Sequence, residues 1–179
     1  VILAVGLAAV VASRAYGGTL QPPDHLTVER RTDPIGLETR TPRFGWWLGK
    51  GFVRQKQYRV LVASDPQKLA ADEGDLWDSG WVVSPDSVDI RYGGKPLGDS
   101  QRVWWKVRVG EWQGAEMAES PWSEPSRFVT GTRNWRAHWI GGKETSPEAG
   151  APAFRKAFAV REGLRAATLH ITGLGFYEA

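Results

Sequence analysis

The stretch VWWKVRV, residues 103–109, alternates side chains of different character with a period of two. An extended chain sends successive side chains to opposite faces. One face therefore carries Val103, Trp105, Val107 and Val109, and the other carries Trp104, Lys106 and Arg108. An apolar face opposite a face with two cations is typical of a half-buried strand. The stretch therefore predicts the strongest strand of a β-rich domain.

Short strands separated by turn residues surround this stretch in the sequence. One short helix is predicted from Asp65, a suitable N-cap, through Pro66 at its first position to Asp72. About seven strands over roughly 100 residues are typical of a sandwich of the immunoglobulin or fibronectin type III kind. We therefore predict an all-β sandwich over residues 25–130. Besides residues 103–109, its main strands are expected over residues 26–31, 43–48, 57–63, 88–92 and 126–129.

The segment SPWSEP, residues 120–125, favours the fibronectin type III version. It precedes the last predicted strand and follows the strand that carries Lys106 and Arg108 outward. We expect Trp122 to pack against these cationic side chains on the face of the sheet. Such a contact contributes about 0.5–1 kcal/mol when exposed, and this role of Trp122 is structural.

Residues 1–12, VILAVGLAAVVA, form an uncharged apolar run. A bilayer-spanning helix needs about 20 such residues, so no membrane span is predicted. The run has the length of the apolar part of a signal peptide, with small residues suited to cleavage after Ala15. We therefore expect a partial signal peptide over residues 1–15, a linker over residues 16–24, and a secreted or periplasmic protein. The alternative is a buried N-terminal strand or helix.

The sequence changes character after the predicted sandwich. Residues 131–150 have the glycines of a linker, but Trp135 and Trp139 predict that it is packed down, because a free linker lacks large apolar groups. Residues 151–179 are expected to begin a second β-sandwich domain, and a segment this short buries no core alone. We expect residues 25–130 to fold alone and residues 151–179 to be poorly anchored. Strands of the second domain are predicted over residues 153–159, 164–172 and 174–179.

Composition excludes several kinds of site. The 179 residues include no cysteine, which excludes disulfides, thiolate metal sites and cysteine nucleophiles. The net charge of +3 comes from 23 basic and 20 acidic residues scattered along the chain, so no nucleic-acid surface is predicted. His25, His138 and His170 lack the spacing of metal ligands. We expect structural roles for them and no cofactor.

No group of residues predicts catalysis. The chain lacks Gly-x-Ser-x-Gly, phosphate-loop and His-Glu-x-x-His motifs. A glycosidase needs two carboxylates that flank the scissile bond, one of them kept protonated. Asp72, Glu73 and Asp75 instead indicate a solvated helix end, and Glu116 and Glu119 indicate a turn. Asp78, Asp86 and Asp89 lack the spacing of a calcium-binding loop. We therefore predict no catalytic, cofactor-binding or metal residue.

A series of sequence blocks, in this order, resembles the N-terminal region of bacterial α-L-rhamnosidases of the inverting family with an (α/α)6-barrel catalytic domain. The blocks are LTVE (26–29), DPIGLET (33–39), PRFGW (42–46), QYRVLVAS (57–64), GDLWDSG (74–80), WKVRV (105–109), WSE (122–124) and AHWIG (137–141). APAFRKAF (151–158) and GLGFYE (173–178) resemble the first strands of the family's jelly-roll-like second domain. Each block is short, but the ordered set over residues 25–179 is specific.

The resemblance implies a parent enzyme that hydrolyses terminal α-L-rhamnosides with inversion. Its general acid and its water-activating residue would both lie in the barrel, so no catalytic residue is carried over to this chain. The resemblance further implies that this region is an inactive scaffold or accessory part. Rhamnose-containing glycosides would bind through the rest of the parent.

Two other functions stay open from the residues themselves. The chain could be a carbohydrate-binding fibronectin-like module of another secreted protein, or an adhesion domain. A carbohydrate-binding module needs exposed aromatic side chains that form a platform for sugar rings. The candidates are Trp46, Trp47, Trp81 and Trp112, which flank turns or fall on alternate faces.

Overall fold

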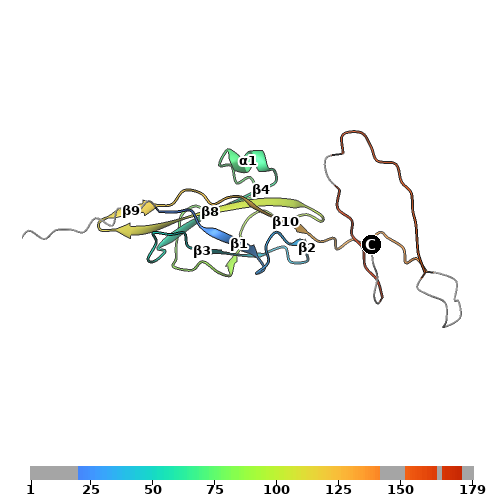
Figure 1. Cartoon of the computed structure of the whole chain (residues 1–179), viewed down its shortest axis with the longest axis horizontal. Helices are drawn as coiled ribbons and strands as arrows, with labels where there is room; N and C mark the ends of the chain where they lie inside the picture. Colours follow the sequence, from blue (N-terminus) through green and yellow to red (C-terminus); the bar gives the residue numbers. More distant parts are fainter. Residues whose placement is uncertain (1–19, 142–151, 165–166, 175–179) are drawn as a thin grey trace, which may run out of the picture.

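The structure is a computed structural model that describes residues 20–141, 152–164 and 167–174. Between residues 24 and 130 the chain forms two sheets that face each other (Figure 1). The smaller sheet has the order β1-β3-β7, with β1 Asp24–Val28, β3 Arg43–Trp47 and β7 Ile90–Arg91. The prediction of an all-β sandwich is confirmed.

The larger sheet has the order β2-β10-β8-β4-β5, with β9 beside β8 and β6 beside β4. Neighbouring strands are antiparallel except β10 and β2, which are parallel. The longest strand, β8, pairs with β4, β9 and β10, so residues 103–109 lie in the middle of this sheet. The strands are β2 Ile35–Leu37, β4 Gln57–Ala63, β5 Trp77–Asp78, β6 Val82–Val83, β8 Arg102–Gln113, β9 Glu116–Glu119 and β10 Ser126–Thr130.

The core lies between the inner faces of the two sheets. The predicted inner face of β8 is confirmed, because Val103, Trp105, Val107 and Val109 are each 0% exposed. From the smaller sheet, Phe44 packs on Trp105 with ring centres 4.5 Å apart. Each large apolar side chain that is fully buried contributes about 1.5–3 kcal/mol. This inner face is therefore a main source of the domain's stability.

A short helix, α1 Pro66–Ala70, lies on the outer side of the larger sheet (Figure 1). The carboxylate of Asp65 accepts a hydrogen bond of 2.7 Å from the backbone N–H of Gln67, which confirms the predicted N-cap. Leu69 is fully buried in a small cluster with Leu61 of β4. The helix ends before the predicted Asp72, which has a φ of 60°.

Some strand ends differ from the predictions. The first strand ends at Val28 because Glu29 and Arg30 have φ angles of 48° and 62°, the left-handed conformation that interrupts a strand. Residues 116–119, predicted as a turn, form β9 and pair with the end of β8. The turn itself is at Gly114, whose φ is 66°. The strands β2 and β6 are too short to show alternation, so the sequence did not predict them.

The strands predicted in the second unit are wrong for the residues that can be described. Residues 152–164 and 167–174 contain no strand, and Phe154, Phe158 and Leu169 are more than half exposed. A strand requires a hydrogen-bonded neighbour, and these two segments pair with none in the described part of the chain. The alternating pattern therefore forms no sheet there. Residues 175–179, which belong to the last predicted strand, lie outside the described residues.

The start of the sandwich lies slightly before the predicted boundary at residue 25. Leu20 is 7% exposed, and the backbone N–H of Gln21 donates to the carbonyl of Lys50 at 2.9 Å. The predicted signal peptide, residues 1–15, lies outside the described residues. Across residues 20–141, 152–164 and 167–174, no helix is both long enough and apolar enough to traverse a bilayer.

Candidate functional site at the end of the sandwich

Of the acidic residues considered above, five form ion pairs with basic side chains of the sandwich: Asp72, Asp75, Asp78, Asp89 and Glu119. Asp78 of β5 accepts two hydrogen bonds, of 2.9 and 2.6 Å, from the guanidinium of Arg59. Desolvation alone would raise the pKa of Asp75, but hydrogen bonds from Lys68 and Ser64 outweigh it and lower this pKa to about 2. Such a carboxyl group is ionised at neutral pH and cannot serve as a general acid.

Asp72 belongs to a row of cations and aromatic rings on the outer face of the larger sheet. Its carboxylate pairs with Lys106, and the hydrogen bond from Lys106 lowers its pKa. Its other oxygen accepts a hydrogen bond of 3.2 Å from the indole N–H of Trp122. Lys106 and Arg108 lie 5.0 and 4.7 Å from the centre of the Trp122 ring. The predicted packing of Trp122 against these cations is confirmed.

The four tryptophans proposed as a sugar platform do not form one surface. Trp46 is 1% exposed and donates its indole N–H to Gln55, so its assignment as a platform residue is wrong. Trp81 is half-buried with Arg108 over its ring. Trp47 and Trp112 are 64% and 54% exposed, but they belong to different sheets. Alternation on β3 directs Trp46 inward and Trp47 outward.

The three histidines have separate environments. His25 stacks on Trp47 with ring centres 4.0 Å apart, and His138 is exposed. His170 contacts Ser100 through a hydrogen bond of 2.9 Å. Among the described residues, no group of three histidine, aspartate or glutamate side chains is placed to hold a metal ion.

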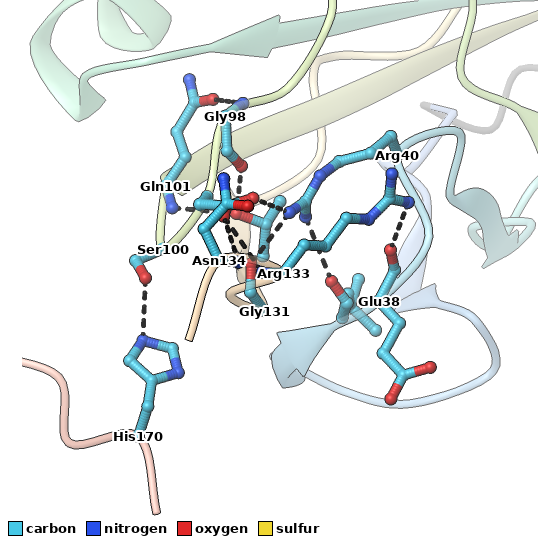
Figure 2. Close-up of polar contacts among 12 residues, drawn as sticks. Glu38, Arg40, Gly98, Ser100, Gln101, Gly131, Arg133, Asn134 and His170 are labelled. Carbon is cyan, nitrogen blue, oxygen red and sulfur yellow. Dashed lines mark hydrogen bonds and ion pairs between the residues drawn. The ribbon is translucent and has the colours of Figure 1, made fainter. Parts of the chain in front are cut away.

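Polar groups from distant segments meet at the end of the sandwich where the chain leaves β10 (Figure 2). Thr130, the last residue of β10, is fully buried and donates its hydroxyl to the carbonyl of Gly98 at 2.7 Å. The next residue, Gly131, donates its N–H to Leu37 of β2 at 2.7 Å. Its carbonyl accepts a hydrogen bond of 3.0 Å from the guanidinium of Arg40. The chain is therefore still held by the sandwich after the last strand has ended.

Asp99 lies at the centre of this end. One carboxylate oxygen pairs with the guanidinium of Arg40. The other accepts hydrogen bonds from the backbone N–H groups of Arg133 at 3.0 Å and Asn134 at 3.3 Å. The hydrogen bond from Arg133 is the main cause of the lowered pKa of Asp99. The ionised carboxylate thus joins the loop before β8 to the chain that follows β10.

A second contact holds the same stretch from the other side. The guanidinium of Arg133 donates to the backbone carbonyl of Glu38 at 2.9 Å, as Figure 2 shows. We name Glu38, Arg40, Asp99, Gly131 and Arg133 the exit clamp.

For the linker, residues 131–150, the prediction that tryptophan side chains pack it down is wrong. Trp135 and Trp139, expected to pack the linker down, are 48% and 69% exposed. The exit clamp holds residues 131–134 by hydrogen bonds instead. No local sequence pattern predicts these hydrogen bonds, because Arg40, Asp99 and Arg133 come from three distant segments.

The comparisons with known proteins agree with this geometry. Residues 23–134 match the family described as "Rha78A-like, N-terminal immunoglobulin domain". The match ends at Asn134, the last residue whose backbone bonds to Asp99. The exit clamp thus lies at the boundary of the domain that the family defines.

Similar proteins and structures carry the name α-L-rhamnosidase. One from Formosa agariphila is 34% identical over 183 residues, covering 94% of this chain and 19% of the relative. One from Streptomyces avermitilis is 39% identical over 128 residues, covering 69% of this chain and 12% of the relative. The structure of the α-L-rhamnosidase from Dictyoglumus thermophilum matches with a TM-score of 0.61 and 36% identity, covering 69% of this chain and 14% of that one.

The chain therefore spans a fifth or less of the relatives that it matches. The family model covers more than half of this chain, and the two-sheet architecture agrees with its description. Residues 23–134 belong to the family of Rha78A-like N-terminal immunoglobulin domains found in α-L-rhamnosidases.

Proposed function

We propose that this chain is the non-catalytic N-terminal part of a secreted α-L-rhamnosidase that hydrolyses terminal α-L-rhamnosides. The observation that supports this most directly is the family match over residues 23–134 together with the α-L-rhamnosidase relatives. The immunoglobulin-like domain is a scaffold in this proposal, and catalysis belongs to a further part of the parent. Secretion is supported by the apolar run at residues 1–12.

The chemistry of the described residues fits a supporting role. Inverting hydrolysis needs two carboxyl groups about 6.5–9.5 Å apart, one of them protonated. The carboxylates Asp72, Asp75 and Asp78 are instead paired with cations, which lowers the pKa of each. They therefore stabilise the sandwich and offer no general acid at neutral pH.

The proposal is tested by comparing three proteins, the first two of which are assayed with p-nitrophenyl α-L-rhamnoside. The 179-residue chain is expected to release no p-nitrophenol, whereas the protein from the complete reading frame is expected to do so. A third protein, the complete one without residues 20–134, should lose thermal stability or soluble yield. Turnover by the 179-residue chain, or no turnover by the complete protein, would contradict the proposal.

Carbohydrate binding is a second candidate function, and exposed Trp47 is the observation that favours it. Trp47 is 64% exposed and its ring stacks on His25, so the indole is held in place beside solvent. Titration of the chain with L-rhamnose while tryptophan fluorescence is recorded tests this. Binding that is lost in Trp47→Ala and kept in Trp112→Ala would support it, and equal signals from both variants would contradict it.

A further inference from the structure

We infer that the end of the sandwich carrying the exit clamp is a docking surface for the chain's own segment around His170, residues 167–174. Asp99 is the positioning residue that sets the direction in which the chain leaves the domain. This inference deepens the proposed supporting role. Its tests use no rhamnosidase activity, so the inference and the proposed function can fail separately.

The direction is fixed because the chain is held on two sides over a few residues. Asp99 receives the N–H groups of Arg133 and Asn134, while the side chain of Arg133 reaches the carbonyl of Glu38. Two neighbouring N–H groups directed at one oxygen fix the orientation of the peptide between them. Hydrogen bonds to a charged acceptor are also about twice as strong as neutral ones.

Arg40 keeps the Asp99 carboxylate in place for this task. Its guanidinium pairs with Asp99 and also donates to the carbonyl of Leu37 at 3.4 Å and to that of Gly131 at 3.0 Å. The Arg40 side chain is only 16% exposed. One half-buried cation thus connects β2, the loop before β8 and the start of the connection.

Contacts made directly beside the exit clamp identify the segment that occupies this surface. Ser100, the neighbour of Asp99, hydrogen-bonds the ring of His170 at 2.9 Å, as seen in Figure 2. The same ring meets Trp135 edge-on, with centres 6.4 Å apart. The segment around His170 therefore returns to the end of the sandwich where the connection begins.

The occupant and the segment before it, residues 152–164, carry exposed apolar side chains. Large hydrophobic residues that are more than half exposed there include Phe154, Phe158, Val160, Leu164 and Leu169. A second β unit built from this segment would bury such side chains in its own core. What this unit needs from the immunoglobulin-like domain is a fixed attachment point, and the exit clamp with Ser100 supplies it.

Trypsin cleavage of the 179-residue chain tests the role of Asp99. In the wild type, the Arg133–Asn134 bond should be cut more slowly than Arg136–Ala137, because only the former lies in the exit clamp. In Asp99→Ala, the ratio of the two rates should rise by about tenfold or more. The loss of charge-assisted hydrogen bonds raises the population of the locally open form by at least this factor.

Asp78→Ala is the matched control, because it breaks the ion pair with Arg59 and leaves the exit clamp intact. Both variants are compared by thermal unfolding and by mass spectrometry of the tryptic fragments. A ratio that rises in Asp99→Ala and stays unchanged in Asp78→Ala supports the inference. An unchanged ratio in Asp99→Ala, or an equal rise in both variants, overturns it, because Asp99 would then act only through global stability.

The docking contact is tested by a double-mutant cycle between Ser100→Ala and His170→Ala. The readout is the rate of amide hydrogen exchange in residues 167–174, the proposed occupant, measured by mass spectrometry. Each single variant should raise the rate by about twofold or more, and the double variant should add nothing further, because the two side chains share one contact. Additive effects, or no effect of either variant, overturn the docking of this segment.

Discussion

Arg108 of β8 lies against Trp122, with its guanidinium carbon 4.7 Å from the centre of the indole ring. The same guanidinium carbon is 4.8 Å from the centre of the Trp81 ring. Its Nε–H is buried without a hydrogen-bond partner among the described residues, and one Nη lies 3.4 Å from Glu119. Two aromatic faces therefore hold this cation in addition to the ion pair.

The first prediction follows from this arrangement. Arg108→Ala should lower the free energy of unfolding by about 1–3 kcal/mol, because it removes two cation–π contacts in a partly desolvated position. Urea denaturation measures the change. Arg91→Ala, at an exposed position of β7, is the control and should cost less than about 0.5 kcal/mol. Equal losses in the two variants would show that the aromatic rings do not stabilise Arg108.

The second prediction concerns the pH dependence of Asp75. Its pKa is lowered to about 2 in the folded chain from its ordinary value of 3.8, so ionised Asp75 favours folding. The contribution is present above the unfolded pKa and is lost as the pH falls towards 2.

Unfolding of wild type and Asp75→Asn, measured by urea between pH 2 and 7, checks this. The wild type should be more stable by about 1–2 kcal/mol at pH 7, and the difference should disappear near pH 2. Comparison with the variant isolates Asp75 from Asp72 and Asp78, whose pKa values are lowered too. A difference that is constant across this pH range contradicts the prediction.

The sequence was sufficient for the features that depend on local periodicity. Alternation over residues 57–63 and 103–109 predicts β4 and the inner face of β8, because successive side chains of a strand point to opposite faces of the sheet. The helix start at Asp65 was predicted because an N-cap acts within three residues. The order of strands and the pairing of β2 with β10 need contacts between distant segments, which one sequence does not show.

The candidate site was hardly predictable for the same physical reason. Asp99 lies in a turn and has no neighbour in sequence that indicates a role, yet it bonds Arg40 and residues 133–134. Trp46 and Trp47 illustrate a different error. The sequence suggested that both could be exposed, whereas adjacent residues on a strand point to opposite faces and only one of them can face solvent.

The third prediction concerns Gln55, which is 1% exposed and links two segments of the sandwich. Its Oε1 accepts the indole N–H of Trp46 at 3.0 Å, and its Nε2 donates to the carbonyls of Ser84 and Asp86 at 3.1 and 2.6 Å. Gln55→Leu leaves the indole N–H of Trp46 and the carbonyls of Ser84 and Asp86 without the hydrogen bonds that Gln55 makes to them. The variant should lose about 2–4 kcal/mol of unfolding free energy.

Thermal and urea unfolding of Gln55→Leu are compared with Gln113→Leu, which changes an exposed glutamine at the end of β8. The control should stay within about 0.5 kcal/mol of the wild type. If Gln55→Leu is as stable as the control, the apolar side chain compensates for the lost hydrogen bonds, and the network does not stabilise the sandwich.

The fourth prediction concerns Gly94, where two parts of the backbone come close together. A Cβ atom at this position would lie 2.3 Å from the carbonyl oxygen of Leu76 and 2.5 Å from the Cβ of Trp77. The carbonyl belongs to the backbone and cannot rotate away as a flexible side chain does. Gly94→Ala should therefore force the loop after β7 away from β5 and cost about 2–3 kcal/mol.

The matched control for Gly94→Ala is Gly141→Ala, because an added Cβ at Gly141 meets no atom within 4 Å. Both variants are compared by thermal unfolding, and the control should unfold at the wild-type temperature. The indole of Trp77 packs on Phe44 and Tyr92, so displacement of the loop should also change the tryptophan fluorescence of Gly94→Ala before unfolding. A Gly94→Ala variant with wild-type stability would mean that the loop relaxes at little cost, and that the close approach at Leu76 does not fix its position.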